Sequence, residues 1–352
     1  MASITGSQYD VYAGGQTINF GITSDPNNVP PPVGGDFNLE VVVNATGTGS
    51  YNTASGYQGL AILSTDGHTL TLLHGAYWVI DDGANGGGND HIYLGDGAES
   101  VTGASGDTLT GGTGNNQFID ATLGAETVYG GTGGSETIWG GAQTSIQGGS
   151  GGNETIVGAA GTTITGGSGG DEFINGYGGG QSITGGSGGN ETIWGSSSGN
   201  PADTIQGGAG NETIVGGTGD TITGGSGNEF INAYLGGESI SGGSGNETIW
   251  GSESGQPGNT IQGAAAGGSA TIAFSATHNA ETLWDDGTAS GNDTVYNYNT
   301  AGGDNFSMAS GETISSSNVV GGNVVVTLSD GSTITFAGTT DVAGIVGSFH
   351  NH

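Results

Sequence analysis

Three consecutive stretches decide the fold: GGAGNETIV at 207–215, GGSGNEFIN at 224–232 and GGSGNETIW at 242–250. The glycines, the acidic residue and the isoleucine keep the same positions in all three. Shorter relatives precede each of them: DTIQ at 203–206, DTIT at 220–223 and ESIS at 238–241. Each unit predicts a short strand followed by a glycine-rich turn, because glycine accepts positive φ at little steric cost. Repetition of such units predicts an all-β parallel solenoid.

The spacing of one column of acids gives the number of strands per coil. The intervals between successive members are 18, 18, 19, 21, 17 and 18 residues. This period matches two strand-and-turn units, so we expect a two-sheet roll of about 18 residues per coil with these acids along one rim. A three-sided helix would scatter them over different edges. The column contains Glu136, Glu154, Glu172, Glu191, Glu212, Glu229 and Glu247.

The isoleucines supply the predicted core. Successive side chains of a strand point to opposite sides, so one large aliphatic residue per strand is expected to point inward. Such a thin core is stable only as a stack in which neighbouring coils share burial. One sheet is expected to carry Ile138, Ile156, Ile174, Ile193, Ile214, Ile231 and Ile249, and the other Ile146, Ile164, Ile183, Ile205, Ile222, Ile240 and Ile261.

Outward aromatic residues recur with a longer period of 55 to 57 residues, or three coils. Trp139, Trp194 and Trp250 form this series, and Phe173 and Phe230 lie one coil before the last two tryptophans. Regularly spaced exposed aromatics predict an assembly or ligand face. The alternative is that the insertions following the second and third tryptophans fold back and cover the indoles.

Composition excludes several functional classes. The 352 residues include 33 Asp and Glu but no Lys, Arg or Cys, which gives a net charge of −33. Nothing basic is present to bind nucleic acid or an anionic membrane, and no apolar run is long enough to insert into a membrane. Without cysteine, disulfides and thiolate metal sites are also excluded. The first thirty residues do not have the pattern of a Sec signal peptide.

Stacked glutamates repel one another, and no basic side chain can neutralise them. Three solutions are open: cations bridge the column, protons neutralise it, or the side chains extend into water. Glycine turns rich in carbonyl groups suit Ca²⁺, which takes six to eight oxygen ligands. Crowding that raises the carboxyl pKa values would favour protons instead.

The repeats resemble the GGxGxDxUx nonapeptide of RTX (repeats in toxin) proteins, over about residues 83–296. GNDHIY at 88–93 and GNDTVY at 291–296 carry the expected aspartate. The resemblance implies a parallel β-roll with Ca²⁺ bound by this carboxylate and by backbone carbonyls of the turns. It marks Asp90 and Asp293 as the nearest matches to the metal ligands. In the central repeats, a glutamate, one methylene longer, stands at the same position; Glu212, Glu229 and Glu247 are the further candidate ligands.

The two ends differ from the repeats. Asp66-Gly67 and Asp330-Gly331 each predict a hairpin between flanking apolar runs. The first strands are expected to pack on their own domain or to add to a neighbouring subunit. The expected domains are an N-terminal strand arm with a Pro-rich spacer (1–35), an N-terminal β cap (36–82), the β-roll (83–278) and a C-terminal β cap (279–352).

The C-terminal region resembles that of RTX proteins exported by type I secretion. This resemblance implies contact with the type I secretion machinery and a location outside a Gram-negative cell or on its surface. Enzymatic activity is not expected, because the acids recur with the repeat whereas an active site is a unique constellation.

We therefore predict a secreted structural protein that self-assembles into a filament, matrix or surface layer. The open ends of a solenoid favour end-to-end pairing between copies. The alternative is a monomeric calcium-dependent adhesin that binds surface polysaccharide through the aromatic series.

Overall fold

A computed structural model of the chain separates into two compact units, Met1–Gly170 and Asp171–His352. For residues before 67 only the backbone is described. The Pro-rich spacer (25–35) lies outside the described residues. These are 7–13, 16–23, 37–43, 48–51, 59–63, 67, 69–72, 78–81, 88–97, 99–197, 199–265, 268–285, 287–288 and 291–352.

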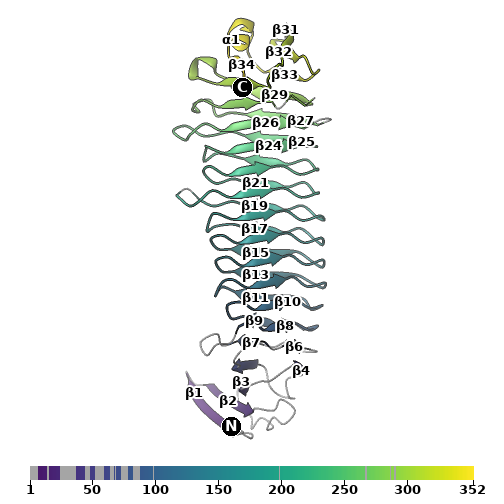
Figure 1. Ribbon diagram of the computed structural model, residues 1–352, viewed down its shortest axis with the longest axis vertical. Coiled ribbons are helices and arrows are strands. Elements are labelled where there is room, and N and C mark those ends of the chain that lie inside the picture. Colours follow the sequence, from purple (N-terminus) through teal and green to yellow (C-terminus); the bar gives the residue numbers. More distant parts are fainter. Residues whose placement is uncertain are drawn as a thin grey trace. The chain divides into compact units, whose positions relative to one another are not determined.

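The first unit is a parallel solenoid whose strands alternate between two sheets (Figure 1). Each residue pairs with its equivalent one coil later, as Ile138 does with Ile156 and Leu109 with Val128. The prediction of two strands per coil is confirmed. One sheet contains β3 (Phe37–Val43), β5 (Gly59–Leu63), β7 (Trp78–Asp81), β9 (Ser100–Thr102), β11 (Gln117–Ala121), β13 (Glu136–Gly140) and β15 (Glu154–Gly158). The other contains β4 (Thr48–Tyr51), β6 (Thr69–Leu72), β8 (His91–Tyr93), β10 (Thr108–Thr110), β12 (Thr127–Tyr129), β14 (Ser145–Gln147) and β16 (Thr163–Thr165).

The hairpin predicted at Asp66-Gly67 is wrong. Strand β5 pairs in parallel with β3 and β7, whereas β6 pairs in parallel with β4 and β8. Gly67 has a φ of 76°, and a corner between two sheets needs such a residue as much as a hairpin does. The parallel ladders therefore run through residues 37–81, where a separate cap was expected.

The N-terminal strands pack on their own chain. Strand β1 (Ser7–Ala13) pairs antiparallel with β2 (Gln16–Thr23), and β2 pairs in parallel with β3. This arrangement extends the first sheet of the unit by two strands.

The second unit repeats the two-sheet arrangement. Parallel pairing continues through β28, β29 and β30, beyond the boundary expected at residue 278. One sheet contains β17 (Phe173–Asn175), β19 (Thr192–Trp194), β21 (Thr213–Val215), β23 (Phe230–Asn232), β25 (Asn246–Trp250), β27 (Ser269–Ala273) and β29 (Asn292–Tyr296). The other contains β18 (Ser182–Thr184), β20 (Thr204–Gln206), β22 (Thr221–Thr223), β24 (Ser239–Gly243), β26 (Thr260–Ala264), β28 (Thr282–Trp284) and β30 (Asn305–Met308).

Antiparallel strands and one short helix close the C-terminal end of this unit. Strand β33 (Thr333–Phe336) pairs with β29 and, antiparallel, with β32 (Asn323–Leu328), which confirms the hairpin at Asp330-Gly331. Strand β31 (Ile314–Val320) pairs with β32, and β34 (Phe349–Asn351) pairs with β30. Helix α1 (Val342–Gly347) was not predicted; the side chain of Asp341 caps it by accepting a hydrogen bond from the Gly344 N–H.

The core of each unit is the predicted pair of isoleucine columns. All fourteen predicted inward isoleucines are buried, with 0–3 % of each residue exposed. Full burial of an aliphatic side chain stabilises by about 1.5–3 kcal/mol. Because each isoleucine is covered by its neighbours in adjacent coils, the stack as a whole is stable where a single coil is not. In the part of the chain that is described, no helix is long and apolar enough to cross a membrane.

Candidate metal-binding site

The glutamate of each repeat points into the roll. In the second unit the coils from β17 to β25 carry Glu-Thr-Ile or Glu-Phe-Ile in the first sheet. Strand alternation puts the glutamate on the same inward side as the isoleucine. Strand register places these glutamates above one another. They are 1–2 % exposed, so the alternative in which they extend into water is wrong. We call them the glutamate column: Glu172, Glu191, Glu212, Glu229 and Glu247.

Few donors reach this column. The Gly227 N–H donates to Oε1 of Glu229 at 3.0 Å, and the Gly245 N–H donates to Oε1 of Glu247 at 2.9 Å. Among the described residues, no donor reaches Oε2 of these two side chains or either oxygen of Glu191 and Glu212. Buried carboxyl oxygens without a donor are costly, so the column needs a further partner.

Burial is the main cause of raised pKa values in the column. It raises the pKa of Glu191, Glu212 and Glu247 to about 7, and adjacent carboxyl groups add to the increase. The pKa of Glu229 is also raised by burial and by Glu212. Since the chain has no Lys or Arg, the negative charge is compensated by protons or by bound cations.

The turns leave space around each carboxylate that only glycine permits. A Cβ atom at Gly210 would lie 3.0 Å from Oε1 of Glu212, and one at Gly225 would lie 3.0 Å from Oε2. Unpartnered carboxylate oxygens within a narrow cradle of backbone match the oxygen ligands that Ca²⁺ prefers. The residues fit the ion: Glu191, Glu212, Glu229 and Glu247 would hold it together with carbonyl groups of the turns.

In the first unit, an amide interrupts the equivalent column. Gln117 donates from Nε2 to Oε2 of Glu99 at 2.6 Å, and its Oε1 accepts from the Gly112 N–H. The Gly131 N–H donates to both carboxyl oxygens of Glu136 at 2.9 Å. In the first unit, N–H groups of the protein therefore bind carboxylates that correspond to those of the glutamate column.

A second inward polar column lies at the opposite corner and was missed from the sequence. Its members immediately precede the strands of the second sheet, two residues before the buried apolar side chain. Asp220 accepts from the N–H of Asp203 at 2.8 Å and from the Gly217 N–H at 2.6 Å, and Asp203 accepts from Gln181 and Ser196 in the same way. The recurring acid in DTIQ, DTIT and ESIS was the available signal. We call this the second-sheet column: Asp203, Asp220, Glu238, Asn259, Glu281 and Asp304.

One member of this column binds a histidine. Nε2 of His278 lies 2.8 Å from Oδ2 and 2.9 Å from Oδ1 of Asp304, and Nδ1 contacts the carbonyl oxygen of Ser275. Burial alone would lower the pKa of His278, but the Ser275 carbonyl and the Asp304 carboxylate outweigh it and the pKa is raised. Both ring nitrogens face acceptors, so the ring is an imidazolium.

An asparagine precedes the glutamate in successive repeats and forms an exposed ladder. Nδ2 of Asn211 donates to Oδ1 of Asn190 at 3.2 Å, Asn228 donates to Asn211 at 3.0 Å, and Asn246 donates to Asn228 at 3.1 Å. The backbone N–H of each residue makes the same bond. The ladder thus connects one turn to the next outside the glutamate column.

The structure separates the predicted metal ligands. It brings Glu212, Glu229 and Glu247 into one column. Asp293 lies at the same corner two coils after Glu247, and Ala270 occupies the position between them. The carboxylate of Asp293 accepts a hydrogen bond from the Ala270 N–H at 2.8 Å. Burial raises the pKa of Asp293 to about 6. Asp90 begins β8 at the second-sheet corner of the first unit, where its N–H donates to Oδ1 of Asp107. It does not belong to the glutamate column.

The aromatic series is exposed. Trp139, Trp194 and Trp250 are 46 %, 47 % and 50 % exposed. Each packs edge-to-face against a phenylalanine one coil earlier, with centroid distances of 5.3 Å to Phe118, 5.1 Å to Phe173 and 4.9 Å to Phe230.

The insertion after Trp194 extends to the preceding corner instead of covering the indole. Its Asn200 donates to the carbonyl oxygen of Tyr177, and its Pro201 carbonyl accepts from the Gly180 N–H. The alternative in which this insertion covers the tryptophan is therefore wrong.

Comparison with known proteins agrees with this geometry. The family model of the RTX calcium-binding nonapeptide repeat matches residues 86–107, 185–222 and 223–254. Searches of curated proteins and of solved structures gave no significant match. The matched segments include Asp90, Glu212, Glu229 and Glu247. The repeats and the parallel β-solenoid together fit an RTX-like β-roll protein, and the repeats indicate Ca²⁺ binding.

Proposed function

We propose that the chain is a calcium-stabilised structural protein that is exported and assembles end to end into a filament, matrix or surface layer. RTX repeats are typical of secreted proteins and are typically structural or toxin-associated. Calcium binding supplies the stabilisation. Export by a type I machinery and assembly from copies of the same chain are parts of the proposal, as is the lack of enzymatic activity.

Open sheet edges are the observation that carries the proposal. Among the described strands, β31 pairs only with β32, and Val319 and Val320 near its end are 48 % and 59 % exposed. In the first unit, β1 pairs only with β2 among the strands that are described. An unpaired edge is a template for a strand of another chain. Two different edges that pair head to tail produce an open polymer.

Electron microscopy of the purified protein tests this function. With Ca²⁺ present, we expect long regular fibres from the unmodified chain and dispersed particles from the Val319→Lys/Val320→Lys variant, because lysines on an edge strand block pairing. Leu123→Lys is the control, since Leu123 is 60 % exposed but belongs to neither edge strand. Fibres from the edge variant, or particles from the unmodified chain, would contradict end-to-end assembly.

A second candidate function is a calcium-dependent adhesin or polysaccharide binder. The exposed Trp–Phe pairs favour it, because regularly spaced aromatic rings suit stacking against sugar rings. Pull-down with bacterial surface polysaccharide distinguishes the two candidates. Retention that is lost in Trp194→Ala/Trp250→Ala, together with an absence of fibres, would support the adhesin.

A further inference from the structure

A group of three acids lies outside the matched repeats, near the C-terminal end of the second unit. Asp285 follows β28, Glu312 precedes β31, and Asp330 lies in the turn between β32 and β33. Each offers one carboxylate oxygen, and these oxygens all lie within 4.8 Å of one another. The fold thus brings together acids from three separate segments.

Both carboxyl oxygens of Asp285 and one of Glu312 are buried without donors among the described residues. Asp285 is 4 % exposed, and neither of its oxygens has a hydrogen-bond partner within the described part of the chain; the same holds for Oε2 of Glu312, which is 7 % exposed. Asp330 is held by the protein, through the N–H and hydroxyl of Ser332 at 2.8 and 2.5 Å. Buried, unpartnered carboxylates aimed at one point indicate a missing counter-ion.

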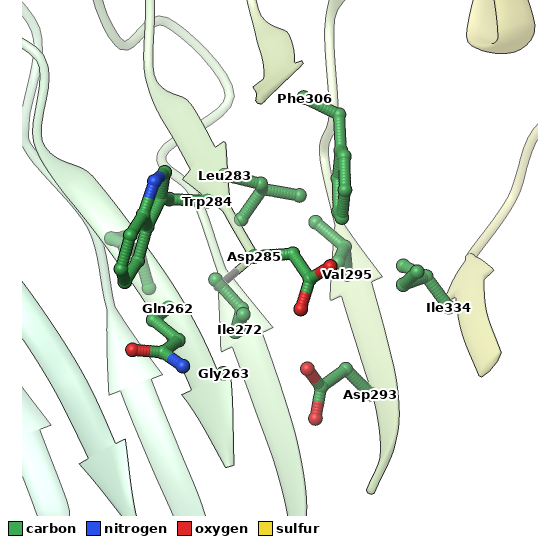
Figure 2. A pocket seen from close by; sticks show the side chains of 11 residues that line it. Gln262, Gly263, Ile272, Leu283, Trp284, Asp285, Asp293, Val295, Phe306 and Ile334 are labelled. Atoms are coloured by element: carbon green, nitrogen blue, oxygen red, sulfur yellow. The ribbon is translucent and has the colours of Figure 1, made fainter. Parts of the chain in front are cut away.

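A fourth acid adds to the negative charge. Asp285 and Asp293 line one cavity together with Gln262, Trp284 and Phe306, and their carboxyl groups are turned toward each other (Figure 2). The chain contains no Lys or Arg, and the ring of His352 is engaged by Trp284 and Ser307. The described side chains therefore supply no positive charge to this cluster.

We propose that Asp285, Glu312 and Asp330 bind a Ca²⁺ ion at a site distinct from the repeats. Three carboxylates provide up to six hard oxygen ligands, which suits the high coordination number of Ca²⁺ better than the strict octahedron of Mg²⁺. The ligands come from a solenoid coil and from one end of the antiparallel strands, where β31 begins beside the end of β32. The ion would therefore fasten β31, β32 and β33 to the coil that contains β28.

Native mass spectrometry of the full chain tests the site by counting bound ions. Burial and the neighbouring acids raise the pKa of Glu312 to about 8, so the measurement is made above that pH to prevent protons from competing. We expect Asp285→Asn/Glu312→Gln to bind one Ca²⁺ fewer than the unmodified chain. Glu253→Gln, which removes an exposed acid, should leave the number unchanged.

Hydrogen exchange locates the effect. Ca²⁺, but not Mg²⁺, should protect residues 312–336 of the unmodified chain, and the double variant should lose this protection while residues 185–254 keep theirs. Asp330→Asn is a milder variant for the case in which the double variant does not fold. It should raise the Ca²⁺ concentration that is needed for this protection roughly tenfold.

Two outcomes would overturn the proposal. One is an unchanged ion count with unchanged protection in a folded variant. The other is a double variant that is as well protected without Ca²⁺ as the unmodified chain is with it, which would show that protons alone neutralise the cluster.

Discussion

The glutamate column and the second-sheet column occupy opposite corners of the same coils, yet their carboxylates differ in the number of hydrogen-bond donors that reach them. In the second-sheet column, Asp203 and Asp220 each accept two backbone N–H groups. In the glutamate column, Glu191 and Glu212 accept none from the described residues. The side chains of both columns are similarly buried, so the columns differ in their donors and not in their exposure. Asp203 and Asp220 are part of the scaffold, whereas Glu191 and Glu212 keep carboxyl oxygens that can bind an ion.

Glu238 sharpens this comparison because it lies in the second-sheet column but resembles the glutamate column. Neither of its carboxyl oxygens has a partner in the described structure, and burial, with Asp220 and Glu281 nearby, raises its pKa to about 8. The N–H of Asp220, which would be its donor by analogy, instead donates to the Gly217 carbonyl. A carboxylate at this corner is thus satisfied only when the backbone of the preceding coil is directed at it.

The largest expected effect is that of removing Ca²⁺ from the glutamate column. A site saturated a hundredfold above its Kd stabilises the fold by about 2.7 kcal/mol, so several sites together dominate the stability of the second unit. We expect EDTA to lower the midpoint of thermal unfolding, followed by circular dichroism, and to abolish hydrogen-exchange protection of residues 185–254. An unchanged midpoint in EDTA would show that the column does not need the ion.

In the absence of Ca²⁺, stability should depend on pH with a definite sign. The folded-state pKa of Glu191, Glu212 and Glu247 is raised from 4.5 to about 7, so the folded chain binds more protons than the unfolded chain between these values. Stability should therefore fall as pH rises through this window. Urea unfolding across the window, with and without Ca²⁺, measures this; a flat profile in EDTA would contradict the raised pKa values.

Asp220→Ala should be more harmful than Glu212→Gln when both are measured in EDTA. The first change leaves two buried N–H groups without an acceptor and should cost about 1–3 kcal/mol for each. The second removes a buried carboxyl group that has no donor, so we expect little loss or a gain. With Ca²⁺ present, Glu212→Gln should also destabilise. Equal effects in EDTA would remove the distinction between the two columns.

A smaller effect is expected for His278→Gln. Since the folded-state pKa of His278 is raised, its contribution is complete below the ordinary value of 6.5 and is lost as pH rises through the folded value. A hydrogen bond between charged groups contributes about 1.5–3 kcal/mol. The loss in the free energy of unfolding should thus be greatest at low pH. A loss independent of pH would show that the ring is not charged.

The smallest effect is expected for Glu238→Gln. Because the pKa of Glu238 is about 8, the side chain is largely neutral at pH 7 and the amide should change stability by less than about 0.5 kcal/mol. Above pH 8 the variant should be the more stable of the two. Chemical unfolding at both pH values checks this, and a large loss at neutral pH would indicate that Glu238 is ionised.

The sequence predicted the features that repeat and missed those that depend on neighbouring coils. The period of the acids gave two strands per coil, and alternation gave the buried isoleucines. The same alternation applies to Asp220, two residues before Ile222, but one of its two donors, the Asp203 N–H, comes from the preceding coil and leaves no local signal. Gln117 is likewise recognisable only when Glu99 lies beside it. Asp66-Gly67 was misassigned because corners and hairpins both use glycine with positive φ.

The cluster of Asp285, Glu312 and Asp330 could not be predicted from the sequence for the same reason. Its members are 27 and 18 residues apart in the sequence and belong to no repeat. Only the folding of the antiparallel strands back onto the coil brings them together.

The asparagine ladder has a consequence for how such a chain can change length. Each rung binds the next rung in the same register, so an excision that removes one full period, such as residues 224–241, rejoins the ladder with an equivalent asparagine. An excision of half a period would exchange the two sheets and break the ladder. Evolution and protein engineering can therefore shorten or extend this unit only in steps of a complete coil.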